Sequence, residues 1–154
     1  MKRTLTALVA VVLTGCTPAD LLVGSYNVTL SGLDTTTAPG MSTSTPSGTG
    51  TVAITHGIAT DYVLLIGQTT ATACQLTGKK NKDKAQVIDI AAGQVCQFSY
   101  STGTVTATLT SGSVTLDAST MNTASLALSY SYTGSVFGIN YAGTGNRTYA
   151  GPRF

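Results

Sequence analysis

The sequence predicts a single all-β domain, an antiparallel barrel or sandwich of about eight strands. Three observations predict it. A chain of 154 residues has the length of one domain with a single core. Segment after segment alternates apolar and polar residues with a period of two, as in half-buried strands. Glycine-containing breaks separate these segments about every ten to twelve residues, which is typical of small sandwiches and barrels.

The composition agrees with a folded β domain. Charged residues make up only 9% of the chain, against roughly 25% in an average soluble protein. Thr, Ser and Gly replace them, and hydrophobic residues still amount to 42%. A disordered chain would show the opposite balance, with high charge and few apolar residues.

The first 15 residues have the pattern of a signal peptide. Lys2 and Arg3 form a positive segment, and the apolar run from Leu5 to Leu13 follows it. This run is too short to span a bilayer as a helix, which needs about 20 residues, but it suits a signal helix. Without Lys2 and Arg3, the six remaining basic residues balance six Asp. The net charge of the mature chain therefore gives no indication of nucleic-acid binding.

The stretch LTGC at residues 13–16 resembles the lipobox of bacterial lipoproteins. The resemblance implies cleavage between Gly15 and Cys16 and attachment of a diacylglyceryl group to the Cys16 thiol. Two or three acyl chains give a stable membrane anchor. Residues 16–22 would then be a lipidated tether, with residues 23–154 forming the β domain. Thr17 stands where an Asp commonly marks inner-membrane retention, so the resemblance implies an outer-membrane location.

Nine segments after the tether have strand character. The clearest is residues 122–134, where Ala124, Leu126, Leu128, Tyr130 and Tyr132 share one face. The others are residues 24–32, 50–57, 61–67, 71–78, 84–92, 94–100, 103–119 and 135–143.

Two stretches interrupt the strand pattern. Residues 34–50 contain Pro39 and Pro46 and few large apolar residues, which predicts a long, mobile loop. Residues 79–84 (KKNKDK) hold four of the six mature basic residues and predict a charged turn between two strands. This turn could contact anionic lipid headgroups or lipopolysaccharide. The simpler interpretation is a solvated hairpin tip whose lysines discourage edge pairing.

Cys74 and Cys96 are expected to form a disulfide, because export places them in an oxidising compartment. In the chain-entropy model such a bridge contributes roughly 3 kcal/mol. A full strand of residues 86–90 between the two cysteine strands would separate their Cα atoms by about 9.6 Å, which is beyond disulfide range. We therefore expect that middle segment to be short, splayed outward or in another sheet.

Catalytic chemistry has few candidate residues. The chain has no Glu, and its six Asp are scattered along the sequence. His56, the one histidine, could act as a base only if the fold brought a nucleophile and an acid beside it. The glycine-containing turns lack the ending of a phosphate-binding loop. The sequence therefore predicts no enzyme, no cofactor, no metal site and no nucleic-acid partner.

The mature domain also resembles lipocalin-like barrels at its two ends. Gly24-Ser25-Tyr26 opens the first strand, and Arg147 follows the last strong strand. In that family a glycine and an aromatic residue open the first strand, and a late arginine packs over the ring; here Tyr replaces the usual Trp. The resemblance implies a cup for an apolar ligand. The residues expected to line such a cup, or else the core, are Tyr26, Tyr62, Leu64, Ile66, Leu126, Leu128, Tyr130 and Arg147.

Two functions follow as expectations. The first is a structural or interaction lipoprotein, anchored through acylated Cys16, that binds an envelope protein or a polysaccharide. The second is a lipocalin-like carrier of a lipid or another hydrophobic molecule. A cavity of at least about 300 Å³ would favour the carrier, and a packed core would favour the interaction protein. The many small Thr, Ser and Ala residues, and the absence of Trp, favour the packed form.

Overall fold

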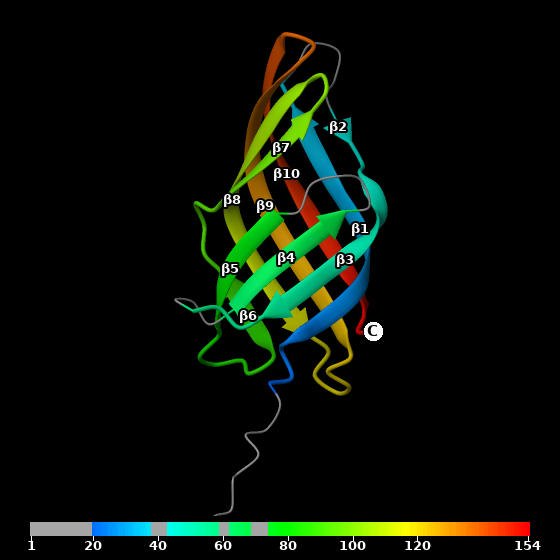
Figure 1. The fold of residues 1–154 in the computed structure, drawn as a ribbon, viewed down its shortest axis with the longest axis vertical. Helices are drawn as coiled ribbons and strands as arrows, with labels where there is room; N and C mark the ends of the chain where they lie inside the picture. Colours follow the sequence, from blue (N-terminus) through cyan, green and yellow to red (C-terminus); the bar gives the residue numbers. More distant parts are fainter. Residues whose placement is uncertain (1–19, 38–42, 59–61, 69–73) are drawn as a thin grey trace, which may run out of the picture.

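The computed structural model describes residues 20–37, 43–58, 62–68 and 74–154, which form a closed antiparallel barrel of eight strands (Figure 1). The expectation of an all-β antiparallel domain with about eight strands is confirmed, and the form is the barrel. Residues 1–19, with the expected signal helix and the lipobox, lie outside the described residues. The strands are β1 (Gly24–Thr36), β2 (Thr43–Ser44), β3 (Ser47–Thr55), β4 (Tyr62–Gln68), β5 (Cys74–Lys80), β6 (Val87–Ile90), β7 (Val95–Tyr100), β8 (Gly103–Leu116), β9 (Thr123–Val136) and β10 (Ile139–Pro152).

The wall is an up-and-down arrangement in which neighbours in the chain are neighbours in space. Its order is β1, β3, β4, β5, β6, β8, β9 and β10, and β10 pairs with β1 to close it. Two short strands add to this wall: β2 pairs with β1, and β7 pairs with β8 beyond the end of β6. No helix in the described part of the chain has the length and hydropathy of a membrane span.

The barrel has two distinct ends. Residues 20–23, residues 56–58 after β3, the β5–β6 and β8–β9 turns and the C-terminus gather at one end, which we call the proximal end (Figure 1). The β7–β8 and β9–β10 turns lie at the opposite, distal end. The chain therefore joins the barrel at the end that is farthest from these two hairpin tips.

Inward-facing side chains fill the barrel from the proximal end to its middle. Tyr26, Leu64 and Val114 have no exposed area, and their neighbours along each strand alternate between buried and exposed. Small barrels of this kind hold just enough interior space for their own side chains. Leu22, which the sequence assigned to the tether, is also buried in this core. The packed core therefore includes a residue that precedes residue 23, although the first barrel strand begins at Gly24.

The Cys74–Cys96 disulfide joins β5 to β7, with 5.5 Å between the Cα atoms. It forms because β6 is only four residues long and pairs with the far end of β5. The expectation of a short middle segment is therefore confirmed. Beside the bridge, the Gln94 side chain accepts a hydrogen bond from the Thr77 amide and donates one to the Thr77 carbonyl. The Gln94 side-chain amide thus makes the hydrogen bonds to Thr77 that the main chain of a neighbouring strand would otherwise make.

The structure corrects the long loop that was predicted for residues 34–50. β1 continues to Thr36, and β3 begins at Ser47, so much of this stretch is strand; residues 38–42 lie outside the described residues. The stretch is poor in apolar residues because its strands extend past the packed core. The charged turn that was expected at residues 79–84 does lie between β5 and β6, but it begins after Lys80, because Lys79 and Lys80 are the last residues of β5.

Candidate functional site

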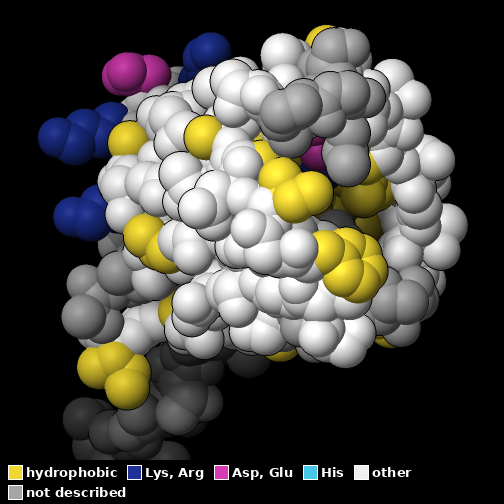
Figure 2. Space-filling view, turned by 90° about the horizontal axis from the view of Figure 1, so that it is seen from above, with side chains coloured by type: hydrophobic (Ala, Val, Ile, Leu, Met, Phe, Trp, Pro, Cys, Tyr) yellow, Lys and Arg dark blue, Asp and Glu magenta, His cyan; other side chains and the backbone are white. Residues whose placement is uncertain are grey.

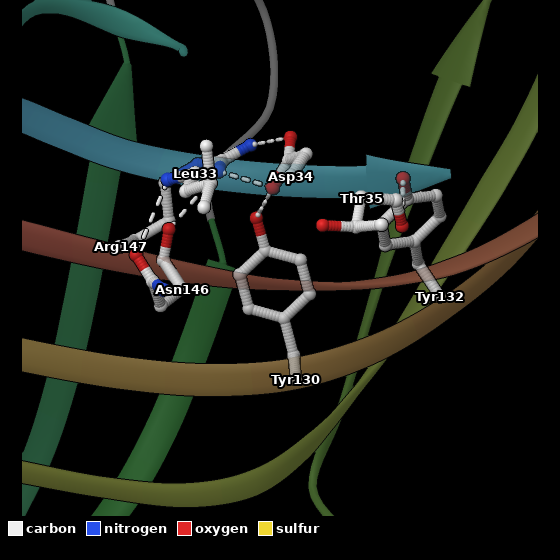
Figure 3. Close-up of polar contacts among 7 residues, drawn as sticks. All are labelled: Leu33, Asp34, Thr35, Tyr130, Tyr132, Asn146 and Arg147. Carbon is white, nitrogen blue, oxygen red and sulfur yellow. Dashed lines mark hydrogen bonds and ion pairs between the residues drawn. The ribbon is translucent and has the colours of Figure 1, made fainter. Parts of the chain in front are cut away.

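Three polar side chains meet on the inner face of the wall, towards the distal end: Asp34 of β1, Tyr130 of β9 and Arg147 of β10 (Figure 3). Arg147 donates two hydrogen bonds to the Asp34 carboxylate, from Nη1 to Oδ1 at 2.5 Å and from Nη2 to Oδ2 at 2.6 Å. The Tyr130 hydroxyl donates to Oδ1 at 2.7 Å. We call this group the polar cluster. Because it links β1, β9 and β10, it braces the seam where the barrel closes.

Glycine in β10 makes room for the polar cluster. Tyr130 faces Gly145 across the β9–β10 ladder, so that its ring lies over the glycine. A Cβ at Gly145 would lie 2.8 Å from the ring and would collide with the Asp34 carboxylate. Arg147 similarly lies against Gly32 of β1, 3.2 Å from the position of a Cβ there. Glycine in a strand often marks such a close approach.

The Tyr130 ring continues into a row of three tyrosines on the same inner face. The ring centroids of Tyr130 and Tyr132 lie 6.1 Å apart, as do those of Tyr132 and Tyr141. Tyr132 lies over Gly143, and Tyr141 lies over Gly134, each on the neighbouring strand. We call this the tyrosine row. Tilted and edge-on contacts of this kind are favourable between aromatic rings.

Burial and pairing fix the charges of the polar cluster. Burial and the hydrogen bond to Asp34 raise the pKa of Tyr130 well above its ordinary value. Burial is the largest single influence on Arg147 and lowers its pKa, but the hydrogen bonding to Asp34, together with the charge interactions with Tyr130, Asp34 and Tyr149, raises the pKa overall. Tyr130 is therefore a neutral hydrogen-bond donor at neutral pH, and Arg147 is a fixed cation. The arrangement can offer hydrogen bonds and ring faces to a ligand.

Among the residues that the structure describes, the distal end beyond the tyrosine row is uncharged and partly apolar. Phe137 is 80% exposed and Ile139 is 59% exposed at the β9–β10 turn. Phe137 and Gly138 both have positive φ, at 52° and 77°, as a two-residue hairpin turn requires. A bulky residue in this conformation is uncommon. Viewed onto this end, the surface is mostly uncharged, with hydrophobic side chains near a depression that contains an acidic one (Figure 2).

The proximal end holds a second group of polar contacts, centred on Asp20. The Asp20 carboxylate accepts hydrogen bonds from the Tyr62 hydroxyl at 2.7 Å and from the Leu22 amide at 3.0 Å. His56 Nε2 lies 3.6 Å from the same carboxylate, and the His56 ring stacks on Tyr62. Partial burial raises the pKa of Asp20, but the bonds from Tyr62 and Leu22, with the charges of His56 and Lys80, lower it overall.

Arg153 closes the proximal end over Tyr26. Its guanidinium lies 5.5 Å from the centre of the Tyr26 ring, and Nη2 donates to the Leu21 and Val23 carbonyls at 2.7 and 2.5 Å. Arg147, which the sequence placed over Tyr26, instead lies over Tyr130 at 5.3 Å. The expectation for Arg147 was therefore wrong: the arginine over the Tyr26 ring of the first strand is Arg153.

The structure separates the residues that were expected to line one ligand cup. Tyr130 and Arg147 belong to the polar cluster. The others lie in the packed core, each with at most 8% of its area exposed. These core residues are Tyr26, Tyr62, Leu64, Ile66, Leu126 and Leu128.

Sequence reasoning missed Asp34, Tyr132 and Tyr141 as members of a site. Asp34 lies in the stretch that the sequence predicts to be a loop, and the pairing of tyrosines with glycines appears only once the strand register is known. The sequence does contain a pattern that points to the two tyrosines. In both β9 and β10, tyrosine and glycine recur at every second position and so lie on one face of the strand. In the described part of the chain, no group of three or more His, Cys, Asp or Glu side chains could hold a metal ion.

Comparison of the chain with protein-family models, with curated proteins and with solved structures gives no match.

Proposed function

We propose that this chain is a lipid-anchored protein of the bacterial cell envelope, attached to the outer membrane through acylated Cys16. It acts without catalysis, by presenting the distal end of its barrel to an envelope protein or a polysaccharide. The lipobox-like stretch at residues 13–16 supports the anchor. The position of Asp20 at the proximal end supports the orientation, because four residues from Cys16 reach at most about 14 Å.

The packed interior is the observation that carries the choice of a binding protein over a carrier. Side chains that line a ligand cavity keep accessible area, because the cavity must admit the ligand. Tyr26, Leu64, Ile88 and Val114 have no accessible area, although they face the barrel axis from four different strands. Between the polar cluster and the proximal end, the interior of the barrel is therefore filled by the side chains of the protein itself.

The distal end has the chemistry of a recognition surface. The turns at this end combine Phe137, Ile139 and the tyrosine row with Ser, Thr, Asn and Gly, and they carry no charged residue. Tyrosine and phenylalanine supply rigid contact area at a low cost in conformational entropy, and small polar residues supply adaptable hydrogen bonds. Such a surface fits an uncharged partner better than a charged one.

The anchor is tested by metabolic labelling with a fatty acid. The wild-type protein should carry the label, and the Cys16→Ala variant should not. An unlabelled wild-type protein, or one that keeps its signal sequence, would refute the anchor. This experiment does not depend on what the barrel binds.

The distal surface is tested by cross-linking in intact envelopes. We expect Phe137→Ser/Ile139→Ser to abolish a cross-linked product that the wild type forms. Leu65→Ser, on the outer face of β4 and 45% exposed, is the matched control and should keep the product. Equal cross-linking by the distal variant and the control would count against a distal binding surface.

A lipocalin-like carrier is the second candidate, and one contact favours it. The Arg153 guanidinium lies over Tyr26 in the first strand, which is the arginine–aromatic arrangement that the family resemblance implies. Its ligand would have to bind above the polar cluster, against the tyrosine row. Native mass spectrometry of protein purified from its own envelope separates the two functions. A bound small apolar molecule would favour the carrier, and a bare domain would favour the interaction protein.

A further inference from the structure

The lysines of the mature chain all lie at one end of the barrel. Lys79 and Lys80 end β5, and Lys82 and Lys84 lie in the β5–β6 turn that follows; all four are exposed at the proximal end (Figure 1). We call these four residues the lysine turn. Asp83 and Asp89 are the acidic residues of the turn and of β6, and Asp20 and Asp117 lie elsewhere at the proximal end. The four lysines and Arg153 therefore outnumber the aspartates described at this end, and the excess of positive charge lies in the lysine turn. Asn81 orders the turn by accepting hydrogen bonds from the Asp83 and Lys84 amides.

Three exposed hydrophobic side chains share this end with the lysines. Leu21 is 51% exposed, Phe154 is 70% exposed, and Ile58 is fully exposed. They come from the N-terminal segment, the C-terminus and the stretch after β3, so the fold places residues that are distant in sequence at the same end of the barrel. The Phe154 amide donates a hydrogen bond to the Ser25 carbonyl, which fixes the C-terminus beside the start of β1.

Asp20, four residues after Cys16 in the sequence, lies at this same end. Asp20 is held by Tyr62 and Leu22, and Arg153 holds the carbonyls of the two residues on either side of Leu22. Lys80, at the end of β5, is close enough to Asp20 to contribute to the lowering of its pKa. Lysines with nearby apolar side chains form the pattern by which proteins bind the interfacial region of a bilayer.

We propose that the proximal end is a membrane-docking face, which binds the anionic headgroups of the bilayer that holds the lipid anchor. The lysine turn contacts the headgroups, while Leu21, Ile58 and Phe154 enter the boundary between headgroups and acyl chains. The anchor alone fixes only the position of the chain; this face would fix the tilt of the barrel and direct the distal end away from the membrane. The proposal rests on the proposed function for the anchor, but its chemistry does not require acylation.

The test uses the chain from Thr17 onward, which contains the whole closed barrel and lacks the acylated cysteine. Co-sedimentation is measured with vesicles rich in phosphatidylglycerol and with vesicles of phosphatidylcholine alone. We expect binding to the anionic vesicles, weakening as salt is raised because exposed charges are screened. Replacing Lys79, Lys80, Lys82 and Lys84 by Gln should weaken binding by roughly fivefold per lysine. Replacement of all four by Arg should preserve it.

Matched apolar variants locate the face. Ile58→Ser/Phe154→Ser, at the proximal end, should weaken vesicle binding, whereas Phe137→Ser/Ile139→Ser, at the distal end, should leave it unchanged. Circular dichroism would show that each variant keeps the β spectrum. No binding to anionic vesicles, binding that survives the four Gln substitutions, or loss with the distal pair would overturn the proposal. Failure of fatty-acid labelling at Cys16 would remove the anchor but would leave these vesicle results as they stand.

Discussion

The two ends of the barrel each contain an arginine from β10 or the residue after it, and each arginine lies over a tyrosine. Arg147 is 5.3 Å from the centre of the Tyr130 ring, and Arg153 is 5.5 Å from that of Tyr26. The hydrogen-bond partners differ. Arg147 binds a carboxylate, whereas the bonds of Arg153 go to main-chain carbonyls and a tyrosine hydroxyl. The same pair of residue types therefore serves two different purposes.

The difference lies in what each arginine holds in place. Arg153 ties the N-terminal segment to the packed core, where Tyr26 has no exposed area. Arg147 forms a neutral pair with Asp34 above that core, and the pair positions Tyr130 in the tyrosine row. Arg153 therefore holds the N-terminal segment against the core, whereas the Arg147–Asp34 pair provides polar contacts at the inner side of the tyrosine row.

Removing the carboxylate of the distal pair should have the largest effect. Asp34→Ala leaves Arg147 and the Tyr130 hydroxyl without their partner in a site where both ionic side chains are only 17% exposed. We expect a loss of about 2–3 kcal/mol in the free energy of unfolding. Chemical denaturation of Asp34→Ala, Arg147→Met and the double variant would measure it. Strictly additive losses would show that the two residues do not act as a pair.

Filling the glycine beneath Tyr130 should come next. Gly145→Val places a side chain against the ring and the Asp34 carboxylate, and the resulting overpacking should cost about 2 kcal/mol. Gly48→Val in β3 is the matched control, because no atom lies within 4 Å of a Cβ there. Thermal unfolding should show a lower Tm for the first variant and little change for the second. Equal shifts in Tm would contradict the close packing of ring on glycine.

The proximal arginine should have a smaller and more local effect. Arg153→Met keeps the stem of the side chain but removes the hydrogen bonds to the Leu21 and Val23 carbonyls, each worth about 1 kcal/mol. Amide exchange should become faster at Leu22 and Val23 and stay unchanged in the polar cluster. Faster exchange throughout the barrel would mean that Arg153 supports the whole fold rather than the N-terminal segment.

The smallest expected effect is on the pH dependence of stability, and it too distinguishes the two ends of the barrel. Asp20 and Asp117, both at the proximal end, have lowered pKa values; hydrogen bonds from Ser119 and Thr120 bring that of Asp117 to about 2. A lowered pKa in the folded state stabilises above the unfolded value of about 3.9 and is lost as the pH falls through the folded pKa. Asp20→Asn/Asp117→Asn should therefore lose less stability than the wild type on acidification below pH of about 4. Parallel pH profiles of Tm would contradict this.

Much of the fold could be predicted from the sequence, because the core follows a simple period. The alternation that includes Leu126 and Leu128 marks β9, and the Cys74–Cys96 disulfide follows from the expected export to an oxidising compartment. These signals are local. The strand that closes the barrel, β10, was harder to predict. It contains Gly143, Gly145 and Gly151, which resemble turn residues when the sequence is considered alone. They are strand residues whose missing side chains leave room for neighbours.

The candidate site depends on contacts between distant residues, and so it was only partly predictable. Tyr130 and Arg147 were singled out, but Asp34 lies 113 residues before Arg147 and appears in a stretch rich in Thr. Its role depends on the register in which β10 returns to β1. That register also decides which arginine covers Tyr26. No local pattern around residue 147 or residue 153 contains this information.

The most direct test of the difference between the ends is hydrogen–deuterium exchange of the acylated protein in anionic vesicles, compared with the same protein in detergent. We expect added protection in the β5–β6 turn and in residues 56–58 at the proximal end, and no change in the β7–β8 and β9–β10 turns. Protection confined to the distal turns, or equal protection at both ends, would contradict an orientation in which the proximal end faces the membrane and the distal end remains free to bind.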